Sequence, residues 1–366
     1  MGWIRLVGPC VAAGLLISSL RAPVQADVRF DPSGTALVDG VPFFPVGLYL
    51  YHFDSDVLAE VHQQGFNTVI YGVTPKDVDT LKRHGLMTIP YPTEEWLAVK
   101  DHPAILSWYL SDEPEGHGKS PADMRKEYER VRALDPTRPA GLCHYLWDAL
   151  AKYKDSADYV MSDVYPVLAK RTQALIPVSD HIDQIHRIHG SGFPVWPVIQ
   201  VFGGPDTEDG KWAPPTPVEV RCMTYLALAH GAKGMLFFSY WPKAPRTWAE
   251  VGVLCRELHR LTPFLVLPGQ EMDVRSPDKA IHTRGIRVGR AGIVIAVNVE
   301  PTFRTAALAV RGVRGTLDVP FENRRIAVRR GELVDRLMPY GVHIYQWGET
   351  PQIRPVPKEK AASAPK

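Results

Sequence analysis

The sequence lacks long apolar runs outside its first residues, has few cysteines and carries almost no excess charge of either sign. A helix that crosses a bilayer needs about 20 apolar residues, and no stretch after Leu20 is that long, so the mature chain is expected to have no membrane span. A formal net charge of +2 gives no electrostatic reason to expect nucleic acid or an anionic membrane surface as a partner.

Beyond Cys10, the cysteines are Cys143, Cys222 and Cys255, an odd and widely spaced set. This spacing is not that of a disulfide framework, and no pair shows a C-x-x-C or metal-ligand pattern. Buried thiols are therefore predicted, with one disulfide as the alternative. The sequence shows no nucleotide, flavin or metal signature, so neither a cofactor nor a metal is expected.

The chain begins with the features of an export signal. Arg5 precedes an apolar run from Leu6 to Leu20, and Ala22-Pro-Val-Gln-Ala26 follows. A basic start, a short apolar run and a small-residue ending are typical of a cleavable secretory signal. Residues 1–26 are predicted to be a signal peptide, and the protein is expected to be secreted or periplasmic. Cys10 lies inside the apolar run, away from the cleavage site, which argues against a lipid anchor.

A local pattern repeats through the first two-thirds of the mature chain: a short apolar strand, a loop, a helix start, an amphipathic run and a glycine. In the helix start Ser120-Pro-Ala-Asp123, serine can cap free N–H groups, proline suits the first position, and aspartate favours the positive end of the helix dipole. Thr74-Pro-Lys-Asp77 and Thr216-Pro-Val-Glu219 repeat this start. Glycines suited to ending a helix stand at Gly65, Gly85, Gly190 and Gly231.

The strand candidates between these helices are mostly continuous apolar runs, as in parallel strands that are covered on both faces. They are Phe43–Tyr49, Thr68–Gly72, Met87–Tyr91, Ile105–Ser111, Ala140–Tyr145, Tyr159–Val164, Val195–Val201 and Gly234–Tyr240. Eight strands with helical connections predict a (β/α)₈ TIM barrel. An open doubly wound sheet is the alternative, but no glycine-rich phosphate loop follows any of these strands.

The pattern changes after Pro268, where short strand candidates follow one another without helical segments. These are Gly292–Val299, Ala306–Val310, Arg325–Val328 and Gly341–Trp347. The prediction is a barrel domain over residues 27–265, a small all-β, sandwich-like domain over 266–350, and a disordered tail over 351–366. The segment Asp27–Val41 is expected to form a β-hairpin against the bottom of the barrel.

Catalytic groups in such barrels lie at the C-terminal ends of the strands. Asp112-Glu113-Pro114 stands at the end of the fourth strand candidate. Adjacent carboxylates repel each other, which raises one pKa and favours a protonated acid at neutral pH. The alternative is a loop pair that caps the next helix, although Ser120 is the better cap. Asp163, at the end of the sixth strand, is a further candidate catalytic carboxylate.

Polar and aromatic residues at the other strand ends are candidates for binding substrate. The predicted set is Tyr49, Tyr51, His144, Tyr165, Gln200 and Trp241. Aromatic rings at strand ends, together with Trp96 and Trp147, suit stacking against the C–H faces of sugars. Packing in the core is the alternative for each single ring.

Two stretches resemble the barrels of glycoside hydrolase families 2, 5 and 42. Val41-Pro-Phe-Phe-Pro-Val-Gly47 is similar to their first strand. His102-Pro-Ala-Ile-Leu-Ser-Trp108, continuing to Glu113-Pro114, is similar to the fourth strand and its acid/base motif, and Trp241 matches a tryptophan after the eighth. The resemblance implies a hydrolase of O-glycosidic bonds in an oligo- or polysaccharide, with Glu113 as the general acid/base.

Two departures from these families leave the mechanism open. Asp112 replaces their asparagine, and Gln200 stands where their nucleophilic glutamate is expected. Three alternatives follow. Asp112-Glu113 resembles the pair of hexosaminidase families 20 and 123, in which the substrate's acetamido group attacks. A second carboxylate could act instead, from Asp163, Asp206 or Glu208. The third alternative is a carbohydrate-binding barrel without hydrolysis.

Overall fold

The computed structural model describes residues 26–51, 54–170, 174–204, 207, 210–240 and 243–355. The predicted signal peptide, apart from Ala26, lies outside the described residues and remains a prediction. The same holds for the predicted disordered tail beyond residue 355, whereas Ile353, within the predicted tail, packs against the apolar core.

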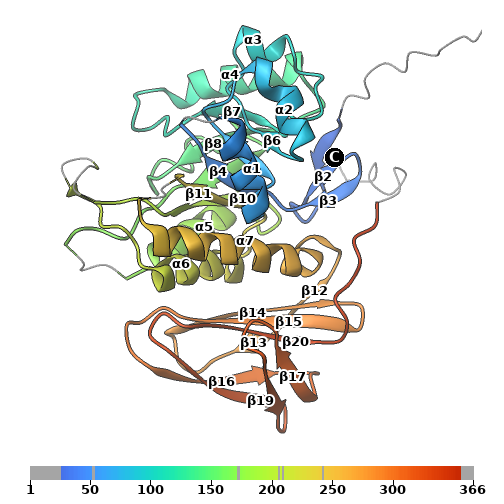
Figure 1. Ribbon diagram of the computed structural model, residues 1–366, viewed down its shortest axis with the longest axis vertical. Helices are drawn as coiled ribbons and strands as arrows, with labels where there is room; N and C mark the ends of the chain where they lie inside the picture. The colour runs from blue at the N-terminus through green and yellow to red at the C-terminus, as the bar shows by residue number, and fades with distance from the viewer. Residues whose placement is uncertain are drawn as a thin grey trace, which may run out of the picture.

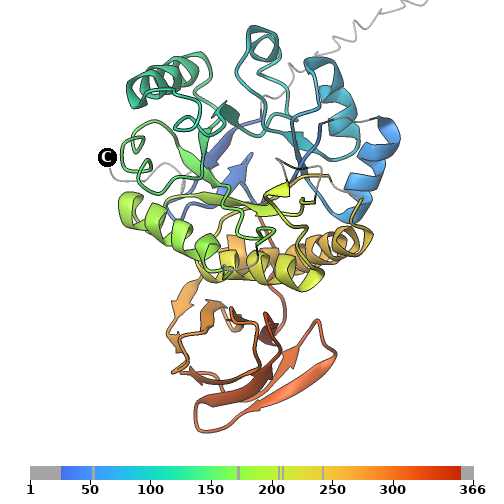
Figure 2. The same cartoon turned by 90° about the vertical axis from the view of Figure 1, so that its left-hand side faces the viewer.

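Eight parallel strands curl into a barrel, with helices in a ring around them (Figures 1 and 2). In sheet order the strands are β6 (Met87–Thr88), β5 (Thr68–Ile70), β4 (Val46–Tyr49), β11 (Met235–Phe238), β10 (Val195–Gln200), β9 (Tyr159–Ser162), β8 (Ala140–His144) and β7 (Trp108–Ser111). The barrel closes between β6 and the segment before β7, where Thr88 pairs in parallel with Ile105 and the N–H of Leu106 donates to the Thr88 carbonyl at 2.8 Å. The predicted TIM barrel is confirmed.

The helices begin and end close to the predicted signals. They are α1 (Ser55–Gln64), a 3-10 helix (Pro75–Asp77) that leads into α2 (Val78–Arg83), α3 (Glu94–Leu97), α4 (Pro121–Leu134), α5 (Pro177–His189), α6 (Pro217–Ala229) and α7 (Pro245–Val266). Thr216 and Glu219 cap each other's N–H groups at the start of α6, and Ser120 accepts from the Asp123 N–H at 3.1 Å. Gly65 ends α1 with φ 101°.

A small antiparallel sheet precedes the barrel, formed by β1 (Val28–Phe30), β2 (Ala36–Val38) and β3 (Val41–Phe43). The Phe30 ring packs edge-on against Tyr159 at 5.8 Å and Trp196 at 5.9 Å, near the starts of β9 and β10. The sheet therefore covers the N-terminal end of the barrel. Phe43, predicted within the first barrel strand, belongs to this sheet instead, since Pro45 has no N–H and separates β3 from β4.

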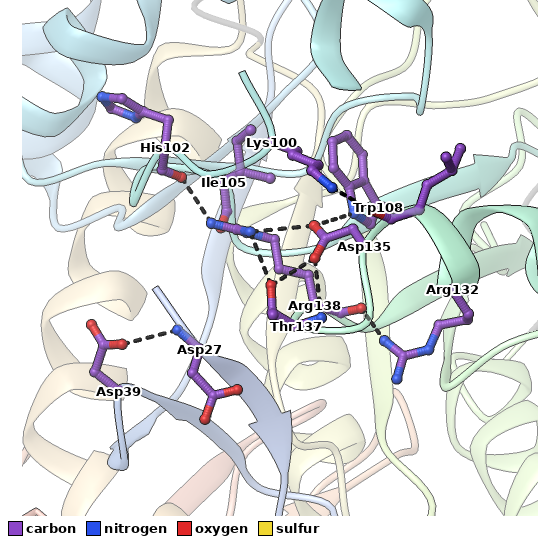
Figure 3. A network of polar contacts seen from close by, with 11 residues as sticks. Asp27, Asp39, Lys100, His102, Ile105, Trp108, Arg132, Asp135, Thr137 and Arg138 are labelled. Atoms are coloured by element: carbon purple, nitrogen blue, oxygen red, sulfur yellow. Dashed lines mark hydrogen bonds and ion pairs between the residues drawn. The ribbon is translucent and has the colours of Figure 1, made fainter. Parts of the chain in front are cut away.

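A buried ion pair ties the start of β8 to the segment before β7 (Figure 3). Arg138 and Asp135 are both fully buried and lie 3.2 Å apart. Arg138 also donates to the carbonyls of Ile105 at 2.9 Å and His102 at 3.0 Å. The Trp108 indole N–H donates to Asp135 at 3.0 Å. This network holds the beginning of β7, the strand that leads to Asp112.

The chain after α7 forms two antiparallel sheets. One contains, in order, β12 (Gln270–Met272), β14 (Ile281–Val288), β15 (Ala291–Asn298), β20 (Val342–Trp347), β17 (Gly315–Val319) and β18 (Arg324–Val328). The other contains β13 (Val274–Arg275), β16 (Arg304–Val310) and β19 (Glu332–Leu337). Apolar side chains such as Val294, Leu308 and Leu333 form a common buried cluster. The first of these sheets faces α6 and α7, with β14 and β15 nearest to the helices (Figure 1). The two sheets confirm the predicted C-terminal β region.

Cys143, Cys222 and Cys255 are free and buried, as predicted. Among the described residues, no helix is both long enough and apolar enough to cross a membrane.

Candidate active site

Strand ends on the C-terminal side of the barrel surround a cavity of about 480 Å³. Asp112 follows β7, Asp163 follows β9, and Tyr49 and Phe238 end β4 and β11. These side chains and that of Glu113 all line the cavity. The structure thus brings the three predicted catalytic carboxyls together in one place.

Tyrosine hydroxyls hold the carboxylate of Asp112. Tyr109 donates to Oδ1 at 2.6 Å and Tyr71 donates to Oδ2 at 3.0 Å, while the hydroxyls of Tyr71 and Tyr91 lie 3.0 Å apart. The rings of Tyr71, Tyr91 and Tyr109 stack with interplanar angles of 18° or less. Because both oxygens accept a fixed donor, the orientation of Asp112 is set before any substrate arrives.

The backbone of Glu113 turns sharply away from β7. Its φ is +37°, a left-handed value that costs a non-glycine residue on the order of 1 kcal/mol or more. The turn is held because the Glu113 N–H donates to the Cys143 carbonyl at 3.1 Å, and the Glu113 carbonyl accepts from the Gly116 N–H at 2.9 Å. Glu113 therefore leaves the strand in a direction different from that of its neighbour Asp112.

The carboxyls of Glu113 and Asp163 both line the cavity, and each shifts the pKa of the other. Burial raises the pKa of Asp163 well above its ordinary value of 3.8, and the neighbouring Glu113 carboxyl raises it further. Burial also raises the pKa of Glu113, partly offset by its interaction with Asp163. Two neighbouring carboxyls cannot both ionise without repulsion, which favours a state in which one of them keeps its proton.

Asp163 is 5% exposed, and its Oδ1 has no hydrogen-bond partner among the described residues. Ligand atoms of Asp112, Cys143 and Asp163 all lie within 4.8 Å of one another. Within the described part of the chain, this is the group that could offer three ligand atoms to a metal ion. Burial raises the pKa of the Cys143 thiol, so the thiol is not a ready thiolate ligand.

His144, predicted to bind substrate, is buried and turned to Glu115. Its Nδ1 lies 2.7 Å from Glu115 Oε2, and Glu115 Oε1 accepts from the N–H groups of Tyr145 and Leu146 at 3.0 and 3.1 Å. Although burial opposes ionisation, the His144 hydrogen bond and charge lower the pKa of Glu115. His144 thus braces the loop after β8, while its neighbour Tyr145 lines the cavity.

One side of the cavity is an aromatic wall, formed by Tyr165, Phe202, Trp212 and Phe238. Phe202 contacts the other three rings, with centroid distances between 5.0 and 5.5 Å. Tyr165 stacks on Phe238 at 5.8 Å. Lys211 also lines the cavity, with its Nζ 4.2 Å from the centroid of the Trp212 ring. Rings next to carboxyls suit a ligand that has both C–H faces and hydroxyls.

Gln200, also predicted to bind substrate, does not line the cavity. It is fully buried, and its amide forms hydrogen bonds with backbone groups of Val167, Phe202 and Ala213. Through these hydrogen bonds the amide connects the loops around the cavity.

The structure distributes the remaining predicted residues as follows. Tyr49 and Tyr165 line the cavity, whereas Tyr51 is 54% exposed and contacts the ring of Phe238 at 5.9 Å. Trp96 is buried in the core, and Trp147 packs against His181 at 5.4 Å. Trp241, Asp206 and Glu208 lie outside the described residues.

The sequence analysis missed several residues of this site. They are Tyr71, Tyr91, Tyr109, Cys143, Phe202, Lys211 and Phe238. Tyr71 and Tyr91 fall at the ends of predicted strands, so the rule that selected Tyr49 could have selected them too. Tyr109 and Cys143 lie inside strands, where no sequence signal separates an inward side chain from ordinary core.

Searches against known protein families and against curated proteins find no match for this chain. Solved structures share its fold. An α-amylase from Geobacillus thermoleovorans, complexed with acarbose, aligns with TM-score 0.56 and 10% identity, over 88% of this chain and 100% of the amylase. A family 27 β-L-arabinopyranosidase from Geobacillus stearothermophilus, in complex with arabinose, aligns with TM-score 0.56 and 11% identity, over 83% of this chain and 96% of the other.

A protein described as a glycoside hydrolase aligns with TM-score 0.57 and 10% identity, over 88% of this chain and 96% of its own. At such identities the likeness shows the fold alone. The chain therefore resembles TIM-barrel glycoside hydrolases in structure.

Proposed function

We propose that this protein hydrolyses O-glycosidic bonds, with Glu113 as the general acid/base. The observation that carries the proposal is that Glu113 and Asp163 line one cavity with Asp112, beside the aromatic wall. Burial raises the pKa of both Glu113 and Asp163, which favours a carboxyl that keeps its proton. Glu113, the less buried member, delivers this proton to the leaving glycosidic oxygen.

The position of a second catalytic group bears on the mechanism. In the two-carboxylate retaining mechanism, a second carboxylate attacks the anomeric carbon. The end of β10, where glycoside hydrolase families 2, 5 and 42 carry that nucleophile, holds the uncharged and fully buried Gln200. We therefore propose that the attacking group is the 2-acetamido oxygen of the substrate.

In this mechanism the acetamido oxygen bonds to the anomeric carbon while the bond to the leaving oxygen breaks and that oxygen takes the Glu113 proton. Water then attacks the anomeric carbon, the carbon–acetamido bond breaks, and the Glu113 carboxylate takes a proton from the water. Asp112 lines the cavity and can accept the acetamido N–H, since each carboxylate oxygen has a second lone pair beside the one used by tyrosine.

The test is hydrolysis of a panel of 4-nitrophenyl N-acetylhexosaminides by the wild-type protein and by Glu113→Gln. We expect the variant to lower kcat by about 10²- to 10⁴-fold, because it cannot donate the proton. Full activity in Glu113→Gln would rule out the assignment of the acid. Equal cleavage of plain glucosides or galactosides would exclude attack by the acetamido group.

A binding barrel without hydrolysis is the second candidate. The observation that favours it is the uncharged Gln200 at the end of β10, where glycoside hydrolase families 2, 5 and 42 carry the nucleophilic glutamate. Under this candidate, oligosaccharide changes tryptophan fluorescence while no glycoside is turned over. For either function we propose that the N-terminal segment directs export, as its sequence indicates.

A further inference from the structure

The amide of Gln200 joins backbone groups on both sides of the cavity's aromatic wall. Its Oε1 accepts from the Val167 N–H at 2.9 Å. Its Nε2 lies 3.0 Å from the Val167 carbonyl and 3.3 Å from the carbonyls of Phe202 and Ala213. Gln200 is fully buried. An amide can donate and accept at once, and these partners require both properties.

These partners lie on two different loops. Val167 follows β9, whereas Phe202 and Ala213 belong to the loop after β10. The loops run side by side, because Leu168 and Trp212 form an antiparallel bridge and the Ala213 N–H donates to the Val167 carbonyl at 3.1 Å. Gln200 lies where the two loops meet, so its amide connects them.

The loop after β10 closes tightly onto itself at the same place. The Gly204 N–H donates to the Trp212 carbonyl at 2.9 Å. Gly203 has φ +153°, and a Cβ at this position would lie 2.2 Å from the carbonyl carbon of Ala213. The position thus requires glycine, and the backbone of Trp212 is held close to the end of β10.

The rings of the aromatic wall extend from this connection. Trp212 and Phe202 are in contact at 5.5 Å, and Tyr165, two residues before Val167, lies 6.5 Å from Trp212. All three rings line the cavity that contains Glu113. Movement of either loop would therefore displace rings that face the substrate.

We propose that Gln200 is a positioning residue that holds the aromatic wall in place and so sets the affinity of the cavity for sugar. This inference rests on the proposed function, because it assigns the wall to substrate. It also explains why residue 200 is an amide. A carboxylate at this position would place an oxygen without a proton against three carbonyl oxygens, which would leave buried acceptors unpaired.

The variants Gln200→Ala and Gln200→Glu test this role. Asn298→Ala is the matched control, since Asn298 is also a fully buried amide and donates to the carbonyls of Thr302 and Met338, both at 2.7 Å, in the β region. We expect both Gln200 variants to raise KM about tenfold on the best 4-nitrophenyl N-acetylhexosaminide, with kcat changed by less than about threefold. The control should lower Tm without changing KM.

A second readout does not depend on turnover. Acrylamide quenching of Trp212, obtained as the difference between each protein and its Trp212→Phe version, should increase in Gln200→Ala and stay at the wild-type level in Asn298→Ala. Unchanged quenching and unchanged KM in Gln200→Ala would overturn the inference. The inference would also be overturned if Gln200→Glu had a raised kcat and formed a glycosyl-enzyme that can be trapped, because residue 200 would then act on the substrate itself. A failure of the proposed function appears separately, as absent turnover or an active Glu113→Gln.

Discussion

The Asp163 carboxyl is deeply buried next to a second carboxyl, that of Glu113. An asparagine at this position would cost less in folding, because an amide carries no titratable charge. The carboxyl instead has a raised pKa and can hold a proton next to the proposed acid. A buried titratable group of this kind is typical of positions where stability is given up for function.

At the residue scale, Asp163→Asn should stabilise the protein at high pH and reduce its activity. The folded pKa is raised, so the stability contributed by the protonated carboxyl is complete below pH 3.8 and is lost as pH rises through the folded pKa. Urea unfolding should show the variant roughly 1–3 kcal/mol more stable than wild type at pH 8 and equal to it near pH 4. Asp180→Asn, at an exposed carboxylate in the first turn of α5, is the control. An unchanged pH dependence in Asp163→Asn would contradict the burial argument.

At the scale of single elements, the barrel depends on how short strands are held in register. β6 has two residues and β7 has four, so few strand hydrogen bonds join them where the barrel closes. The side chain of Arg138, on the turn into β8, supplies further hydrogen bonds to the carbonyls of His102 and Ile105 (Figure 3). The buried Arg138–Asp135 ion pair therefore acts here by fixing the position of the segment before β7, rather than by adding to the net free energy of unfolding.

A double-mutant cycle on Arg138 and Asp135 tests this contribution. Each single change to alanine leaves a buried charge without its partner and should cost about 3–5 kcal/mol of the free energy of unfolding. The double variant should lose clearly less than the sum of the two, since no lone charge remains. The measurement is urea unfolding followed by circular dichroism. Simple additivity would show that the two side chains do not act as a pair.

At the scale of the whole molecule, the C-terminal sheets pack against helices on the side of the barrel. Cys222 of α6 lies 3.7 Å from the Asn298 carbonyl of β15, and Arg284 of β14 donates to the Leu228 carbonyl at 2.9 Å. His230 Nε2 and His282 Nδ1 lie 2.7 Å apart across the same contact. The β region is therefore joined to the barrel by both apolar packing and polar bonds.

This histidine contact predicts a loss of stability in mild acid. Burial, followed by the charge of His230, lowers the pKa of His282 from 6.5 to about 4. Between these values the unfolded chain binds more protons than the folded one, so the free energy of unfolding falls as pH drops from 6.5 towards 4. Thermal unfolding of His282→Gln should show a weaker pH dependence over this range, whereas His62→Gln, on the exposed face of α1, should not. If the unfolding temperature changed with pH equally in His282→Gln and in wild type, His282 would not be the source of the acid sensitivity.

The sequence alone specified the order and type of the barrel elements. Ser120 and Thr216 mark helix starts because capping is a local interaction between residues three apart, and Gly65 marks a helix end because left-handed backbone favours glycine. The position of Asp112 and Glu113 at the cavity followed from the same local reasoning, since strand ends in a barrel share one face.

Only the tertiary structure decided what these residues contact. Glu113 and Asp163 are 50 positions apart, and they line one cavity because the curvature of the barrel brings the ends of β7 and β9 together across β8. The tyrosine contacts of Asp112 and the loop contacts of Gln200 likewise join segments that are distant in the chain. The local sequence determined which residues stand at the ends of the strands. The closure of the barrel determined which of them line one cavity and which hold its aromatic wall in place.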